Sequence, residues 1–103
     1  MSIQTTPIEA GNGKTAEGLE VSWEGGQFVM IIGEHGVLSC GVVDDKVMTR
    51  FGAAVAIARG TPESPLVTPE DLLAAKVADV TSEAAARGVT VGMSGAEALA
   101  KLS

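Results

Sequence analysis

Residues 27–60 read QFVMIIGEHGVLSCGVVDDKVMTRFGAAVAIARG, with apolar runs separated by glycine turns and one short charged segment. Phe28 to Ile32 is apolar at every position, as is most of Val37 to Val43. Runs of this kind predict two inner strands of a sheet that is covered on both faces. Because such cover requires helices, the sequence predicts an α+β fold.

The second half of this stretch predicts a strand, a helix and a parallel strand. Asp44 or Asp45 can cap the helix, and Gly52 can end it. Ala53 to Ala58 then has the apolar character of another buried strand. Parallel neighbours need a crossover connection of this type. The buried face of the helix would carry Val47, Met48 and Phe51.

The amino-terminal part predicts further strands. Residues 1–10 contain Pro7, which suits an edge strand, and lead into the turn Gly11-Asn12-Gly13-Lys14. Residues 19–24 alternate between apolar and polar side chains, so we expect one buried face and one wet face. The buried face would hold Leu19, Val21 and Trp23.

The carboxyl-terminal part follows a loop, Gly60 to Val67, and predicts three short helices around an extended segment, Val77 to Val80. Thr68 starts the first helix with Pro69 in the first helical position. The second begins at Thr81 or Ser82 and ends at Gly88. The third begins at Ser94, forms a capping box with Glu97, and is expected to bury Ala96, Leu99 and Leu102.

Length and composition indicate one domain, residues 1–103, with a core of small side chains. Apolar residues make up 46% of the chain but aromatic residues only 3%. A core with so few large side chains favours additional burial between subunits, so we expect a homo-oligomer.

Charge and hydropathy exclude several classes of partner. The formal net charge is −6 and no cluster of Lys or Arg interrupts it, so nucleic acid is not an expected partner. The longest apolar run, Phe28 to Ile32, is far below the ~20 residues of a membrane span, and the amino terminus has no secretory signal. We therefore expect no membrane contact and a cytoplasmic location. One Cys and one His give little basis for a metal site, and no cofactor is expected.

Several short motifs occur in a fixed order: Gly36-x3-Cys40-Gly41-x2-Asp44, Arg59-Gly60, Asp71-Leu72-Leu73 and Gly88-x3-Gly92-Met93-Ser94-Gly95-x2-Ala98-Leu99. Through these motifs the chain resembles the YunC-like family of bacterial and archaeal domains of unknown function, over essentially its whole length. The resemblance implies a small, oligomeric α+β domain without an established activity. Its mixed sheet would have about four to five strands, with helices packed on it.

The stretch from residue 27 to residue 60 contains the only thiol and the only imidazole of the chain. Cys40 could act as a nucleophile if a nearby cation or helix start favoured its thiolate, whereas the simpler alternative is a buried small apolar residue. Gly41 beside it suggests that another group approaches the backbone. His35 lies in a turn, about 16 Å along a strand from Cys40, so a direct pair of the two would need a neighbouring subunit.

Other candidates have both structural and functional interpretations. Asp44 either caps a helix or faces a ligand at the carboxyl edge of the sheet. Gly92 to Gly95 has the small residues of an anion nest, although Ser94 and Glu97 can satisfy those amides themselves. Arg59, beside the loop from Gly60, could recognise a phosphate or an acid.

Two functions follow from these candidates. In the first, the protein binds a small molecule, with Cys40, Asp44 and the Gly92 to Gly95 turn lining one pocket. In the second, it is a structural or regulatory homo-oligomer without catalysis. A metal site built from mixed ligands has no recognised spacing to support it. The predicted ligand-binding residues are His35, Cys40, Gly41, Asp44, Arg59, Gly92, Ser94 and Gly95.

Overall fold

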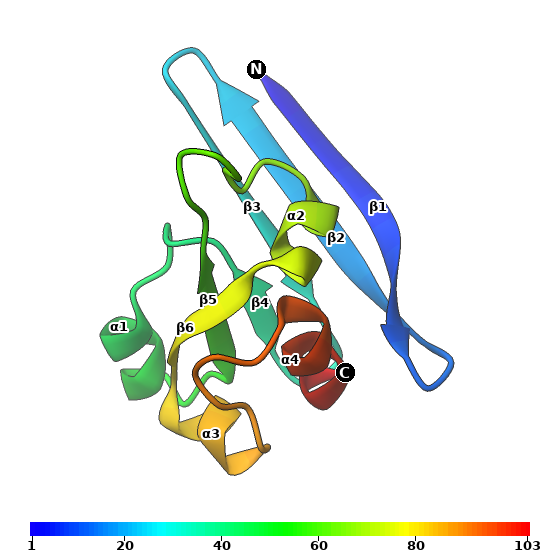
Figure 1. The fold of residues 1–103 in the computed structure, drawn as a ribbon, viewed down its shortest axis with the longest axis vertical. Coiled ribbons are helices and arrows are strands. Elements are labelled where there is room, and N and C mark those ends of the chain that lie inside the picture. The colour runs from blue at the N-terminus through cyan, green and yellow to red at the C-terminus, as the bar shows by residue number, and fades with distance from the viewer.

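Six strands lie side by side in chain order in the computed structural model, which describes all 103 residues (Figure 1). Every neighbouring pair is antiparallel except β4 and β5. The predicted α+β class and mixed sheet are confirmed, but the sheet has six strands rather than four to five. The strands are β1 (Ser2–Gly11), β2 (Lys14–Trp23), β3 (Gly26–Ile32), β4 (Val37–Ser39), β5 (Val55–Arg59) and β6 (Lys76–Val80).

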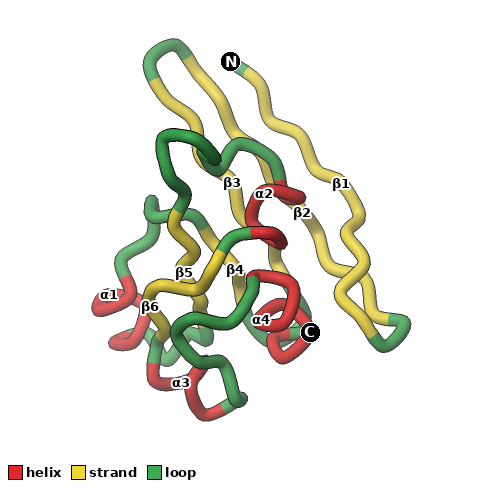
Figure 2. Tube along the Cα trace, in the orientation of Figure 1, coloured by secondary structure: helices red, strands yellow, loops and turns green.

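Four short helices accompany the sheet (Figure 2). They are α1 (Asp45–Arg50), α2 (Pro69–Ala74), α3 (Ser82–Ala86) and α4 (Gly95–Leu102). Their starts agree with the sequence: Thr68 and Ser94 form capping boxes, and Asp44 and Thr81 cap α1 and α3. Side-chain oxygens at these positions accept bonds from amides that have no partner within the helix. No helix has the length and apolar composition that a membrane span requires.

The parallel pair confirms the predicted crossover. Asp44 Oδ1 accepts hydrogen bonds from the amides of Lys46 and Val47, which starts α1 between β4 and β5. Gly52 follows the helix with a φ of 72°, a conformation that favours glycine. The prediction that the strand runs to Val43 is wrong, because β4 ends at Ser39 and residues 40–43 turn towards the cap.

The core lies between one face of the sheet and the helices α2, α3 and α4. Figure 1 shows α2 and α4 over this face of the sheet. The sheet contributes side chains in register across the strands, with Ile31 beside Leu38 and Leu38 beside Ala56. Leu72, Leu99 and Leu102 are fully buried on the helix side. Many of the remaining core residues are alanines, which let helices and sheet approach closely.

The predicted inner face of β2 is wrong. Ala16 and Gly18 face the helices, whereas Leu19 and Val21 are only half-buried and Trp23 is 47% exposed. A Cβ atom on Gly18 would lie 2.8 Å from Cγ of Pro69, so the helix packs where the strand has its smallest residues. Alternation predicts two different faces of a strand, but it does not tell which face the helices cover.

Three other burial predictions need correction. β3 is covered on one face only, since Ile32 is 44% exposed. α1 has no buried residue, and its capping Phe51 is 77% exposed, because this six-residue helix makes its main contact with β5 alone and lies outside the core. In α4, Leu99 and Leu102 are buried as predicted, but Ala98 takes the place expected for Ala96.

Candidate functional site

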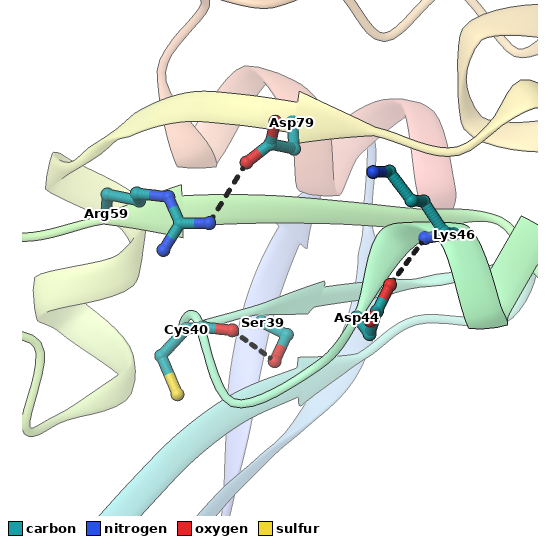
Figure 3. Close-up of polar contacts among 6 residues, drawn as sticks. All are labelled: Ser39, Cys40, Asp44, Lys46, Arg59 and Asp79. Atoms are coloured by element: carbon teal, nitrogen blue, oxygen red, sulfur yellow. Dashed lines mark hydrogen bonds and ion pairs between the residues drawn. The ribbon is translucent and has the colours of Figure 1, made fainter.

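The carboxyl ends of β4 and β5 meet at one edge, because these two strands are parallel. The chain leaves β4 at Cys40 and turns into α1, and it leaves β5 at Arg59 into the loop that begins at Gly60. Figure 3 shows Cys40, Asp44 and Arg59 around this edge. Small molecules commonly bind at such an edge in open sheets. The structure thus brings Gly41, Asp44 and Arg59 together in one cleft.

Arg59 lies across the backbone of Gly41. Its Nη2 donates to Oδ2 of Asp79 on β6 over 3.2 Å, and a Cβ atom on Gly41 would lie only 2.8 Å from Nη1. The group that approaches the backbone at Gly41 is therefore this guanidinium. Two motifs that are far apart in the sequence, Cys40-Gly41 and Arg59-Gly60, meet at this contact.

Cys40 is half-buried and packs against the main core. Its amide donates to the carbonyl of Val29 over 3.1 Å, and its carbonyl accepts from Oγ of Ser39 over 2.9 Å. Figure 3 shows its sulfur pointing away from both Arg59 and Asp44. This geometry fits a packing role better than a nucleophile activated by a neighbouring cation.

Two clefts share Arg59. The larger one has a volume of about 430 Å³ and lies between the end of β5, the loop Gly60–Leu66 and the end of α2. The smaller one has a volume of about 290 Å³ and lies between Arg59 and residues 41–46. The polar side chains of the larger cleft are Arg59, Thr61, Ser64, Asp71 and Lys76.

The larger cleft contains two cations in one cross-strand pair. Arg59 and Lys76 are register partners on β5 and β6, and Lys76 forms no ion pair with any carboxylate. Like charges directly opposite each other on neighbouring strands destabilise a sheet. An anion bound between them would remove this repulsion.

Asp71 supplies a carboxylate to the same cleft, but it is already bound. Oδ2 accepts from the amides of Thr68 over 2.9 Å and Val67 over 3.0 Å. The hydrogen bond from Thr68, followed by that from Val67, holds the pKa of Asp71 below the ordinary value for an aspartate. The carboxylate therefore stays ionised and serves the capping box of α2.

His35 lies at the other end of β4. Its amide donates to the carbonyl of Leu102 over 2.8 Å, and its Nε2 is 3.8 Å from Oε2 of Glu34. Glu34 in turn accepts from Nζ of Lys14 over 2.9 Å, and this bond lowers the pKa of Glu34. His35 and Cys40 therefore flank opposite ends of the strand, and neither cleft includes His35.

The Gly92 to Gly95 turn lines neither cleft, but it adjoins the larger one, because Ser94 forms an antiparallel bridge with Lys76. Its amides are bonded within the protein: Gly92 donates to the carbonyl of Val77 and Gly95 to that of Ala75, both over 2.8 Å. A Cβ atom on Gly95 would collide with the carbonyl oxygen of Leu72, so this glycine lets α4 pack against α2. Nowhere in the structure do three His, Cys, Asp or Glu side chains gather as metal ligands would.

The sequence did not single out Lys76, Thr61, Ser64 or Asp79. Lys76 begins a short strand, and only the strand register reveals that it lies opposite Arg59. Thr61 and Ser64 belong to a loop whose path has no periodic signal. Of the residues that line this cleft, the sequence singled out Arg59, beside the loop from Gly60.

The comparisons with known proteins concern the same part of the chain. The family model described as "Domain of unknown function (DUF1805)" matches residues 39–102. Among solved structures, the chain is similar to TA1206 from Thermoplasma acidophilum, described as a protein of unknown function, with a TM-score of 0.85. The two are 24% identical, and the match covers 99% of this chain and 94% of that one. At this identity the likeness shows a shared fold. No curated protein matches the chain.

Proposed function

The chain belongs to the DUF1805 family, a domain of unknown function, and we propose that it binds a small anionic molecule in the cleft beside Arg59. The observation that carries this proposal is the cross-strand pair of Arg59 and Lys76 in an otherwise acidic protein. We further propose that the YunC-like resemblance describes this same family. In support, the Cys40-Gly41, Arg59-Gly60 and Gly92 to Gly95 motifs all lie within the matched residues.

The chemistry of the cleft suits a carboxylate or phosphate group. Asp79 accepts from one nitrogen of Arg59 and leaves the remaining N–H groups of the fork available. Lys76 adds a second positive charge without a partner of its own. The hydroxyl groups of Thr61 and Ser64 lie in the loop above them and can donate further hydrogen bonds. A charge-assisted pair of this kind binds a planar carboxylate or a phosphate with defined geometry.

Size favours the larger of the two clefts. Small-molecule sites usually occupy about 300–1,000 Å³; the larger cleft of about 430 Å³ lies within this range, and the smaller one of about 290 Å³ lies at its lower limit. Cys40 lines neither cleft, and Asp44 lines only the smaller one. We therefore propose binding without a covalent step, and the expected cytoplasmic location makes a metabolite the natural ligand class.

Titration of the ¹⁵N-labelled protein with inorganic phosphate, and separately with malonate, tests this proposal. We expect saturable amide shifts confined to residues 59–66 and 74–76. Lys76→Gln should weaken binding by about tenfold or more, because it removes a charge-assisted hydrogen bond. Lys101→Gln removes an exposed cation on α4 and serves as the matched control.

Two results would contradict the proposal. One is the absence of saturable amide shifts around Arg59 when each anion is added at about 20 mM, which is roughly 20 times a dissociation constant of about 1 mM. The other is an equal loss of affinity in Lys76→Gln and Lys101→Gln, which would indicate attraction by net charge alone.

A further inference from the structure

The far face of the amino-terminal strands carries apolar side chains that lie outside the core and are half-buried or exposed. Ile3, Val21 and Phe28 are in register across β1, β2 and β3, and Leu19 and Met30 form the next row. None of the five belongs to the buried cluster beneath the helices. Together with Trp23 and Ile32 they form what we call the apolar sheet face.

Exposure on this face is large for a monomer. Ile3 is 64% exposed, Trp23 47% and Ile32 44%. The helices α2 and α4 contact the strands from the opposite side, and the main contact of α1 is with β5. Soluble monomers rarely expose a contiguous apolar patch of more than a few hundred Å².

The aromatic residues are also found outside the core. Trp23 and Phe28 pack edge to face on this side of the sheet, with ring centroids 6.0 Å apart and an interplanar angle of 63°. The third aromatic residue, Phe51, is exposed after α1. Aromatic side chains dominate the energetics of cores and interfaces, and here the core contains none of them.

We infer that the apolar sheet face is the contact surface between two copies of this chain, packed sheet against sheet around a twofold axis. β1 and β2 are about 33 Å long and β3 is about 23 Å long, and at a spacing of about 4.8 Å the three strands present about 430 Å² of plane. Two copies therefore cover about 860 Å² of projected sheet, and the relief of the side chains brings the buried accessible surface towards the ~1,200 Å² at which specific interfaces begin.

Shape favours a second copy over other partners. Two sheets with the same twist are complementary in shape and pack about 10 Å apart at about −30°, as in β-sandwiches. A symmetric contact needs one self-complementary patch, and this face provides one. The net charge of −6 disfavours an anionic membrane surface as the partner. The contact is independent of the anion cleft, which lies at β5 and β6.

Sedimentation equilibrium combined with the fluorescence of the single tryptophan tests the inference. The wild-type protein should be a dimer at about 100 μM and should dissociate on dilution, with a red shift of Trp23 emission as this side chain meets water. Ile3→Glu should raise the dissociation constant by about 100-fold or more, because each dimer would bury two carboxylates without partners.

Val91→Glu is the matched control, because Val91 is 62% exposed and lies in the loop between α3 and α4. We expect it to leave the dimer unchanged, and far-UV circular dichroism should show that both variants fold. A monomeric wild-type protein at about 100 μM would overturn the inference, since dimers of standard-size interfaces persist at that concentration. So would a dimer that Ile3→Glu leaves intact, an equal loss in both variants, or tryptophan emission that changes only when a peptide or lipid is added.

Discussion

Thr81 gives the sharpest test of how the sheet and α3 are joined. Its side chain is 1% exposed and makes three hydrogen bonds. Oγ1 accepts from the amide of Val55 over 3.0 Å and from that of Ala84 over 3.3 Å, and it donates to the carbonyl of Ala53 over 2.7 Å. One hydroxyl therefore completes the start of β5 and the cap of α3.

The substitution Thr81→Val keeps the shape of the side chain and removes this hydroxyl. It leaves the amides of Val55 and Ala84 and the carbonyl of Ala53 without that partner. Each buried group left unpaired costs about 1 kcal/mol or more, and loss of a helix cap typically costs about 1 kcal/mol. We expect the free energy of unfolding to fall by about 3 kcal/mol, a large fraction of the ~5–15 kcal/mol of a small domain.

The matched control is Thr81→Ser, which keeps the hydroxyl and loses one methyl group, at a cost of about 1 kcal/mol. Urea unfolding at equal protein concentration measures both variants, and the slope of the transition should stay unchanged. In a thermal melt the valine variant should lose about 15 °C. If Thr81→Val destabilises the protein no more than Thr81→Ser does, the hydroxyl does not join these elements as described.

Two further predictions concern the cap of α2 and the packing of glycines. Because its amide partners lower the pKa of Asp71 in the folded state, the ionised group adds stability that is present above the ordinary aspartate range and is lost as pH falls through the folded pKa. Asp71→Asn should thus be less stable than wild type at pH 7, and the difference between their urea midpoints should shrink below about pH 4; a constant difference would contradict this. Gly95→Ala should cost about 2–4 kcal/mol in the same assay, since its Cβ meets the backbone carbonyl of Leu72. Gly41→Ala should cost less than about 0.5 kcal/mol, because it meets only the movable end of Arg59, and its effect should appear as a shift of the Arg59 side-chain ¹⁵N resonance; equal costs for the two glycines would refute the distinction.

Local signals in the sequence predicted the starts and ends of the helices well. Asp44, Thr68 and Ser94 each cap the helix that follows, because their side-chain oxygens bond amides two or three residues away. Gly52 and Gly88 follow α1 and α3 with positive φ, as glycines after a helix commonly do. These predictions depend on atoms within one turn of chain and need no knowledge of the rest of the fold.

Predictions that depend on distant partners were less successful. The pattern of residues 19–24 shows two faces but does not identify the covered one, which depends on Pro69 packing against Gly18. The residues predicted for one site do not line one cleft, for the same reason. Gly41 and Arg59 meet because β4 and β5 are parallel, whereas His35 lies at the amino end of β4. Ser94 adjoins the larger cleft through its bridge with Lys76 but does not line it.

The distribution of side-chain sizes links the core to the proposed contact between copies. Small residues such as Ala16, Ala56 and Ala58 line the face beneath the helices, so backbones approach closely but each side chain buries little area. The two aromatic residues of the sheet, Trp23 and Phe28, lie on the opposite face, where only another surface can bury them fully. If that surface is a second copy, binding stabilises the folded chain alone, and the melting temperature must rise with protein concentration. The same rise should be absent in the Ile3→Glu variant, because its monomer keeps the core beneath the helices and loses only the contact.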